Sequence, residues 1–100
     1  MSHHYAHVKE ADLQEWVTTK AAACGWRWYH THDSRRSNPG FPDLVMVHAG
    51  KQRVIYAELK DEHKQPTFDQ WEWLYELQMA GEEAYLWRPS DFPEIEKVLA

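Results

Sequence analysis

The first part of the chain, from about residue 8 to residue 24, repeats apolar residues at helical spacing. Counted at about 100° per residue from Glu10, one narrow sector collects most of the apolar side chains. The members of that sector are Leu13, Val17, Ala21 and Cys24. Gly25 follows and predicts the end of the helix. Because Glu10 falls in the same sector, the pattern points one carboxylate toward the core at the first helical turn.

Extended segments follow this helix. Residues 26–32 are rich in aromatic side chains and predict a strand. Residues 33–40 combine Asp, Ser, Asn, Pro and Gly, which is the composition of a loop. Residues 42–60 hold two β-branched runs on either side of residues 49–52, which predicts a β-hairpin. We expect Gly50 to supply the unusual backbone angle of its turn.

The rest of the chain predicts a helix, a strand and a helix. Residues 66–80 read as a helix, and Gly81 is placed to end it. Residues 83–88 read as a strand, and residues 91–99 as a short helix capped by Asp91. The predicted order is therefore α-β-β-β-α-β-α, in a single α/β domain that spans residues 1–100.

Composition narrows the class of protein. A chain of 100 residues is the size of one domain, and its six tryptophans offer bulky material for a core. No apolar run approaches the roughly 18 residues of a membrane span, and we expect no cleaved signal peptide. The single cysteine, Cys24, cannot form an internal disulfide, which favours a cytoplasmic protein. The net charge of −5 argues against nucleic-acid binding through a general positive field, so such binding needs a local site.

The predicted hairpin brings charged side chains together. Side chains alternate along a strand, so Glu58 and Lys60 point to the same side. A turn at Gly50 and Lys51 places Asp43 directly opposite Glu58, with Cβ atoms about 5 Å apart. A shift of one residue in the turn would remove this pairing. Facing carboxylates repel each other unless a positive charge lies between them.

The three acids Glu10, Asp43 and Glu58 suggest metal chemistry. Leaving buried charges unpaired costs several kcal/mol, against a total stability of about 5–15 kcal/mol. A divalent cation removes this cost, because Mg²⁺ prefers oxygen ligands and keeps several waters. A metal-bound water with a lowered pKa is a ready nucleophile, and Lys60 is placed to orient it or to stabilise charge on a phosphate. This combination is the chemistry of phosphodiester hydrolysis.

The residues that carry this chemistry also resemble a known family. The pattern PD at 42–43 followed by ELK at 58–60 resembles the PD-(D/E)XK nuclease superfamily. The ordered segments EADLQ, GWRWYH, GFPDLVMV, YAELK, FDQWEWLYELQMAG and AYLWRPSDF are similar to VRR-NUC (virus-type replication-repair nuclease) domains. This resemblance covers nearly the whole chain.

The resemblance implies a fold and an activity. It implies a restriction-endonuclease-like core with a mixed four-stranded β-sheet flanked by helices, and a Mg²⁺- or Mn²⁺-dependent DNA endonuclease. The metal ligands would be Asp43, Glu58, the Leu59 carbonyl and Glu10. Lys60 would assist catalysis, and Gln70 matches the family's glutamine at the start of the helix after the ELK motif. Stand-alone members resemble Holliday-junction resolvases, which implies a homodimer that acts on branched DNA in repair, in the cytoplasm of a cell or of a phage's host.

Several residues keep two interpretations. Gln70 also completes a capping box with Thr67, which explains it without catalysis. The loop residues Arg35, Arg36 and Ser37 are placed to bind DNA phosphates, as is Lys64, or they are solvated surface residues. The stripe of Trp71, Leu74 and Tyr75 is interpreted first as core or dimer surface, and only second as a platform for stacked bases.

Two other classes of protein stay open. One is a catalytically silent nucleic-acid-binding module with the same fold. The other is an interaction subunit or inhibitor whose acidic surface meets a basic partner.

Overall fold

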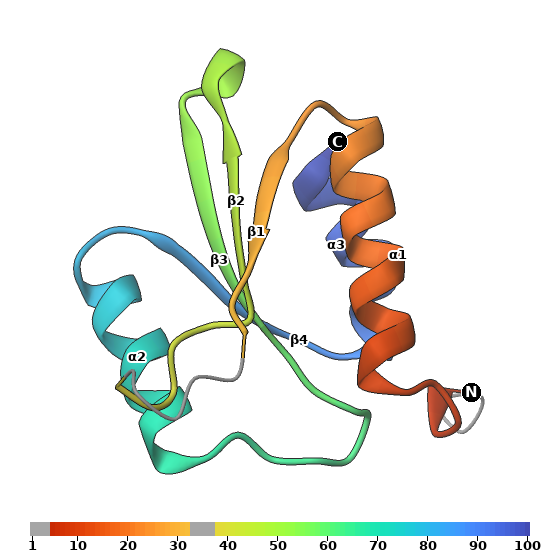
Figure 1. Cartoon of the computed structure of the whole chain (residues 1–100), viewed down its shortest axis with the longest axis vertical. Coiled ribbons are helices and arrows are strands. Elements are labelled where there is room, and N and C mark those ends of the chain that lie inside the picture. The colour runs from red at the N-terminus through yellow and green to blue at the C-terminus, as the bar shows by residue number, and fades with distance from the viewer. Residues whose placement is uncertain (1–4, 33–37) are drawn as a thin grey trace.

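The structure, a computed structural model, describes residues 5–32 and 38–100. Its helices and strands follow the predicted order along the chain (Figure 1). They are α1 (Glu10–Ala23), β1 (Arg27–His30), β2 (Leu44–His48), β3 (Arg53–Leu59), α2 (Phe68–Met79), β4 (Glu83–Trp87) and α3 (Phe92–Leu99). Two short 3-10 turns, Ala49–Lys51 and Pro89–Asp91, follow β2 and β4. Within the described residues, no helix is long and apolar enough to span a membrane.

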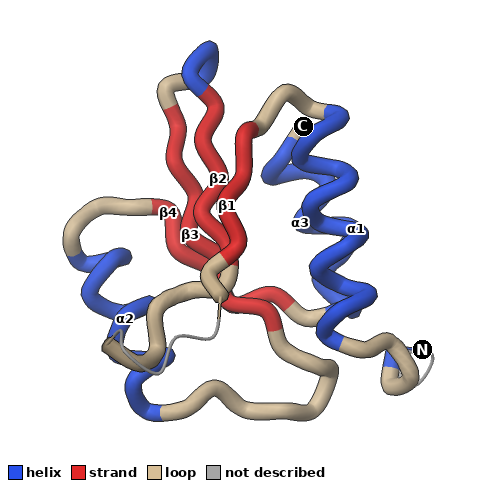
Figure 2. The backbone as a smooth tube through the Cα atoms, viewed as in Figure 1, coloured by secondary structure: helices blue, strands red, loops and turns tan. Residues whose placement is uncertain are grey.

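The strands form one mixed sheet in the order β1-β2-β3-β4. β1, β2 and β3 form an antiparallel meander, and α2 then carries the chain across to β4, which pairs parallel to β3. The helices α1 and α3 lie side by side on one side of the sheet, and α2 lies on the other (Figures 1 and 2). The predicted mixed four-stranded sheet flanked by helices is confirmed.

The core fills the space between the sheet and the α1–α3 layer. The apolar stripe predicted for α1 is buried at Leu13, Val17 and Ala21, which pack in one cluster with the inward side chains of the sheet and α3. The sheet and α3 contribute Leu44, Met46, Ile55, Ala57, Leu59, Ile95 and Leu99. Each large aliphatic side chain buried in this way contributes about 1.5–3 kcal/mol. This packed layer makes the end of the sheet a rigid support for charged groups.

The hairpin has the predicted register but a different turn. Its pairs run from Val47 opposite Val54 to Leu44 opposite Ala57, as alternation about residues 50 and 51 required. The positive backbone angle belongs to Gln52, with φ of 54°, and not to Gly50. A 3-10 turn over Ala49–Lys51 explains the difference, because it keeps its own residues right-handed and closes on the residue that follows.

The ends of the helices follow local chemistry with one exception. Gly25 and Gly81 have φ of 88° and 89° and end α1 and α2 as predicted. Asp91 precedes α3 but does not cap it with its side chain. Its carboxylate oxygen Oδ2 accepts a hydrogen bond of 2.9 Å from the backbone N–H of Arg88, and therefore closes the 3-10 turn after β4.

α2 meets the sheet with a narrower face than the sequence predicts. Leu74 is buried, as expected, but Trp71 is 47% and Tyr75 is 61% exposed, so these two are not core residues. The helix is also fastened to the outer edge of the sheet, where Gln78 Nε2 donates to the Ala84 carbonyl at 2.8 Å. One side of α2 therefore packs against the fold, and a second apolar side faces outward.

Candidate active site

Asp43 and Glu58 face each other where β2 begins and β3 ends. The paired register ends at Leu44 opposite Ala57, one residue from each acid, and the charge of Asp43 acts directly on Glu58. Asp43 is held from both sides, because its Oδ2 accepts from the Leu59 N–H at 2.8 Å and its carbonyl accepts from the Thr31 N–H at 2.8 Å. These backbone contacts aim one carboxylate at the other.

Glu58 is a buried acid beside Asp43. Its side chain is 1% exposed, and neither carboxylate oxygen accepts a hydrogen bond from the described residues. Burial, followed by the negative charge of Asp43, raises the pKa of Glu58 from 4.5 to about 8. Buried carboxylate oxygens are normally satisfied, so these two oxygens are suited to a positively charged ligand.

Among the residues that the structure describes, Lys60 supplies the positive charge paired with these oxygens. Its Nζ lies 3.6 Å from Glu58 Oε2, which is an ion-pair distance but too long for a hydrogen bond. The side chain of Lys60 is itself 8% exposed, and its backbone N–H donates to the Trp87 carbonyl at 3.0 Å. The lysine is therefore fixed on the extension of β3 and points to the same side as Glu58.

Glu10 lies at the edge of this group, in the first turn of α1. It is half-buried, and burial followed by the charge of Asp43 raises its pKa. The charges of Lys60, Lys64 and Asp61 also act on Glu10. The first helix therefore brings its acid within electrostatic reach of Asp43, as the predicted helical sector required.

The chemistry of these donors suits a hard divalent cation that keeps most of its waters. Among the described residues, no three His, Cys, Asp or Glu side chains stand close enough to hold one metal ion together. Mg²⁺ is usually bound in proteins by one or two carboxylates and several waters. Asp43 and Glu58 offer such a pair, and the two buried oxygens of Glu58 accept no hydrogen bond from residues 5–32 or 38–100. The residues present therefore fit the cation.

The other predicted site residues have different surroundings, and three of them are not described by the structure. Gln70 forms the capping box, in which its Oε1 accepts from the Thr67 N–H at 2.9 Å. Lys64 is exposed and close enough to Glu10 to lower its pKa. Arg35, Arg36 and Ser37 lie outside the described residues.

Two residues near the site were given no role there on the basis of the sequence. Asp61 directly follows the lysine, and its Oδ1 is buried without a hydrogen-bond partner in the described part of the chain. Arg88 donates hydrogen bonds to the loop that follows Lys60. Asp61 could have been suspected from its position next to the motif. No pattern in the sequence signals Arg88, because its partners are backbone carbonyls.

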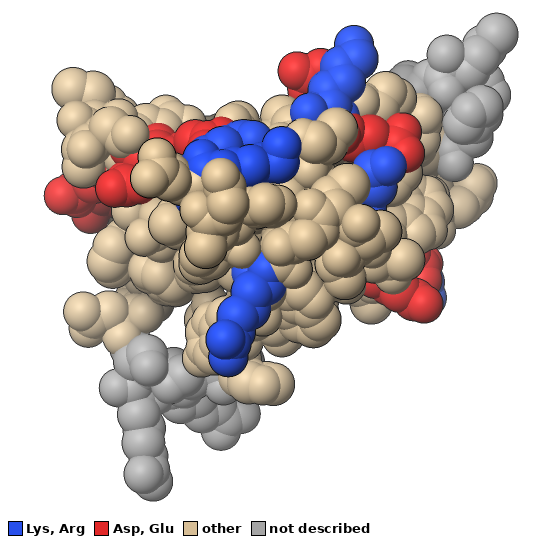
Figure 3. All heavy atoms as spheres, turned by 90° about the horizontal axis from the view of Figure 1, so that it is seen from above, with Lys and Arg blue, Asp and Glu red and all other residues tan. Residues whose placement is uncertain are grey.

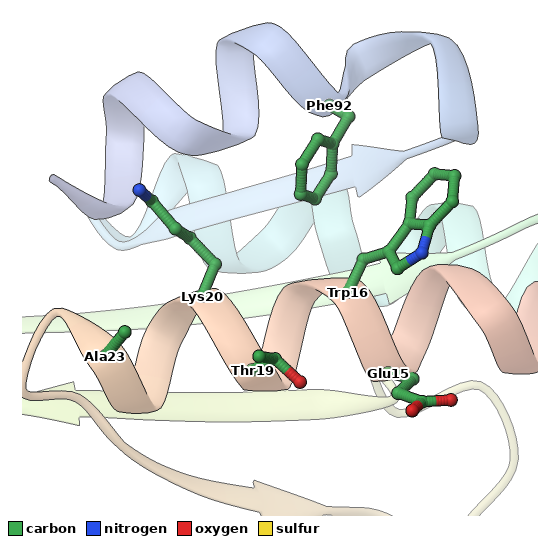
Figure 4. A pocket seen from close by; sticks show the side chains of 6 residues that line it. All are labelled: Glu15, Trp16, Thr19, Lys20, Ala23 and Phe92. Atoms are coloured by element: carbon green, nitrogen blue, oxygen red, sulfur yellow. The ribbon is translucent and has the colours of Figure 1, made fainter.

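A separate groove runs between α1 and α3 and does not involve these acids (Figure 4). It has a volume of 520 Å³ and is mostly apolar, with the rings of Trp16 and Phe92 packed edge to face at 5.2 Å. Its lining residues are Glu15, Trp16, Thr19, Lys20, Ala23 and Phe92. With one carboxylate in its wall, this groove does not have the donors of a metal site.

The charges do not form a broad basic face at the end of the molecule shown in Figure 3. Lys and Arg side chains alternate there with Asp and Glu side chains. This mixture agrees with the net charge of −5. At this end of the molecule, any attraction for a phosphate backbone would therefore have to come from a local group of residues.

Comparisons with known proteins identify the fold. No family model matches the sequence, and no curated protein does. A solved structure described as a VRR_NUC domain superposes with a TM-score of 0.72 at 22% identity, over 90% of this chain and 92% of that chain. Another, described as a VRR_NUC domain protein, gives a TM-score of 0.61 at 18% identity, over 92% of this chain and 85% of that chain.

A third solved structure is Archaeoglobus fulgidus Hjc, a Holliday junction resolvase from an archaeal hyperthermophile. It superposes with a TM-score of 0.59 at 17% identity, over 78% of this chain and 66% of that chain. The chain therefore has the fold of VRR-NUC domains, a restriction-endonuclease-like α/β fold.

Proposed function

We propose that this chain, with its VRR-NUC fold, is a metal-dependent nuclease that hydrolyses phosphodiester bonds of DNA. The observation that carries the proposal is Glu58, whose buried oxygens have no hydrogen-bond partner in the described structure and lie opposite Asp43 and 3.6 Å from the Lys60 ammonium. A purely structural role would leave this group as a cost to folding.

In the proposed mechanism, Asp43 and Glu58, with the Leu59 carbonyl, would hold Mg²⁺ or Mn²⁺ directly, and Glu10 would bind it through one of its waters. When bound, the cation lowers the pKa of a water molecule and offsets negative charge on the phosphate. A hydrogen bond from the Leu59 N–H already orients the Asp43 carboxylate for this role. Glu58 would bind the cation as a carboxylate, because a nearby positive charge would lower the pKa that burial raises.

Lys60 acts on the reacting groups themselves. Its ammonium, fixed beside Glu58, orients the attacking water or stabilises the negative charge that develops on the phosphate oxygens. The water oxygen forms a bond to phosphorus as the bond to the leaving sugar oxygen breaks, and a proton passes to that oxygen. Gln70 is a further proposed catalytic residue, at the N-terminus of α2, where a phosphate is favoured.

The proposed substrate is branched or otherwise structured DNA, cut as an endonuclease in a repair pathway. Support comes from the likeness to a resolvase, which is an argument from fold. Arg35, Arg36, Ser37 and Lys64 are the proposed phosphate contacts. We also propose a cytoplasmic setting, in a cell or in the host of a phage.

A second copy of the chain is the proposed partner, and the outward side of α2 is the proposed interface. Phe68, Trp71, Tyr75 and Met79 stand in one stripe there, 47–76% exposed. Exposed apolar stripes of this kind mark interaction surfaces. Asp69, Glu72 and Glu76 lie beside the stripe and line a cleft of 280 Å³, which makes this face unfavourable for a phosphate backbone.

Cleavage of a DNA panel tests the proposed function. Supercoiled plasmid, branched DNA and single-stranded DNA would be incubated with the protein in Mg²⁺, Mn²⁺ or EDTA. We expect cutting that requires the metal and falls by at least about a hundredfold in Lys60→Ala, as for loss of a charge-stabilising group. Lys97→Ala is the matched control, since Lys97 is exposed on α3.

Other outcomes favour the alternatives. Salt-dependent DNA binding without cutting, by folded protein and with either metal, would favour the catalytically silent nucleic-acid-binding module. No affinity for any DNA would favour an interaction subunit or inhibitor. Unchanged cutting by Lys60→Ala would show that Lys60 is not a catalytic residue.

A further inference from the structure

Arg88 holds the loop that leaves the candidate active site. It follows β4, and its Nη1 donates to the carbonyls of Asp61 at 2.8 Å, Glu62 at 3.2 Å and Lys64 at 2.6 Å. These carbonyls belong to the segment directly after Lys60. Hydrogen bonds from one guanidinium nitrogen therefore hold a loop that contains no helix or strand.

A second set of contacts fastens the same loop to the same junction. The Glu62 carboxylate accepts from the Ser90 N–H at 3.0 Å and from its hydroxyl at 2.6 Å. The Lys60 N–H donates to the Trp87 carbonyl at 3.0 Å. Residues 60–64 are thus attached to residues 87–90 through backbone and side-chain hydrogen bonds.

The fastened loop borders the acidic site. The charges of Lys60, Asp61 and Lys64 all act on Glu10, so the loop side chains lie within electrostatic reach of the first helix. In Figure 1 the chain leaves β3 and passes the N-terminal end of α1 before it turns toward α2. His63 and Lys64 are exposed on this loop, where an approaching phosphate backbone would meet them.

The chemistry of the contact suits a positioning role. In the described structure the guanidinium of Arg88 donates to neutral carbonyls, so its charge is not consumed by a carboxylate. Hydrogen bonds from a charged donor are stronger than neutral ones and fix geometry more closely. A loop left to itself would sample many conformations, and ordering it on binding would weaken the affinity for DNA.

We propose that Arg88 is a positioning residue that holds residues 61–64 in the conformation that presents Lys64 to a DNA phosphate beside the carboxylates. The inference rests on the proposed function for its ligand. Arg88, directly after β4, would therefore affect the affinity for DNA and not the rate of the chemical step.

The test compares Arg88→Met with Arg88→Lys and with a matched control, Arg53→Met. Arg53 also makes several side-chain hydrogen bonds, to Glu83 at 2.7 and 2.8 Å and to the Val98 carbonyl at 3.2 Å, but none to this loop. Hydrogen exchange of residues 61–65 and affinity for branched DNA in Ca²⁺ would be measured first. The kcat and KM for cleavage in Mg²⁺ would follow.

We expect Arg88→Met to speed exchange in residues 61–65, weaken DNA binding and raise KM about tenfold, with kcat within about twofold of wild type. Arg88→Lys is expected to retain most of the affinity, because an ammonium has three N–H donors for the same carbonyls. Arg53→Met is expected to speed exchange in β3, β4 and α3 and to leave KM unchanged.

Faster loop exchange in Arg88→Met with unchanged affinity and KM would overturn the proposal and leave Arg88 with a structural role only. If Arg88→Met does not fold, Ser90→Ala removes one donor to Glu62 and should still raise KM about twofold to threefold, and no rise would count against the proposal. Wild-type protein that binds DNA without cutting it refutes the proposed function, and the affinities then decide the inference. Wild-type protein without DNA affinity refutes both.

Discussion

Glu58 places its carboxylate where water has almost no access, at 1% exposure, and it does so beside a second acid. Its raised pKa follows from burial first and from Asp43 second. At neutral pH and without a cation, the group is therefore mostly protonated. Glu10 has a pKa raised for the same two reasons, in the same order.

This shift predicts how the stability of the metal-free protein depends on pH. An acid whose pKa is raised by folding holds its proton more tightly in the folded state. Its contribution is fully present below 4.5 and is lost as the pH rises through about 8. In EDTA, we expect the free energy of unfolding in urea to fall by about 4 kcal/mol between about pH 5 and pH 9.

Glu58→Gln is the control for this titration. The amide does not ionise, so the variant should lose much less stability over the same pH range, with the small remainder attributable to Glu10. An equal loss in wild type and variant would assign the pH dependence to other groups.

Single residues of the site differ in how far the sequence could predict them. Asp43, Glu58 and Lys60 follow from strand alternation and from a hairpin whose turn is local, so their meeting was predictable. Arg88 lies 24 to 27 residues from the loop that it holds, and its partners are backbone atoms that any sequence has. Such a contact cannot be predicted from residue types, because every residue has a backbone carbonyl.

At the scale of elements, the capping role and the proposed catalytic role of Gln70 can be tested separately in the first turn of α2. The capping box joins Thr67 Oγ1 to the Gln70 N–H at 3.2 Å and Gln70 Oε1 to the Thr67 N–H at 2.9 Å. Glutamate completes the same box as glutamine, whereas alanine at position 67 cannot. One substitution therefore preserves the cap and the other removes it.

We expect Thr67→Ala to lower the free energy of unfolding by about 1 kcal/mol and to leave cleavage nearly unchanged. Gln70→Glu should keep the stability and lose cleavage, because the proposed catalytic role needs the amide. Urea unfolding and cleavage assays on both variants would decide this. Full cleavage by Gln70→Glu would leave Gln70 with the cap alone.

The outward stripe of α2 leads to a prediction about assembly. Tyr75 and Tyr29 are both 61% exposed, one on α2 and the other on β1. We expect Tyr75→Ser to weaken a dimer at least about tenfold in sedimentation equilibrium, since exposed aromatic residues dominate interface energies. Tyr29→Ser is the control and should leave the mass unchanged. Equal behaviour of the two variants, or a wild-type monomer, would place no dimer interface on α2.

Where the sequence analysis was wrong about an element, two local arrangements competed. The hairpin turn used a 3-10 geometry, which moved the left-handed residue from Gly50 to Gln52. The Asp91 carboxylate accepts from the Arg88 N–H in the turn after β4 and does not cap α3. α2 has more apolar residues than one face can bury, so spacing alone could not assign Trp71 to the outside.

At the scale of the whole molecule, the fold was predictable because each element depends mainly on its own sequence. The α1 stripe, the hairpin and the crossover through α2 each restrict the neighbours that an element can have, and together they leave few arrangements. The acids gather at one end of the sheet as a result. With a net charge of −5, the proposed binding of DNA at that end would depend on local contacts.

The bond from Gln78 to the Ala84 carbonyl also bears on aggregation. The Trp87 carbonyl points to β3, so alternate residues of β4, Ala84 and Leu86, turn their backbone groups outward. An outward edge of this kind can template the addition of a strand from another chain, which is how many sheet proteins begin to aggregate. The Gln78 amide occupies one of these few acceptors at 2.8 Å. The edge therefore offers one fewer free acceptor to a strand from another chain, which weakens such pairing.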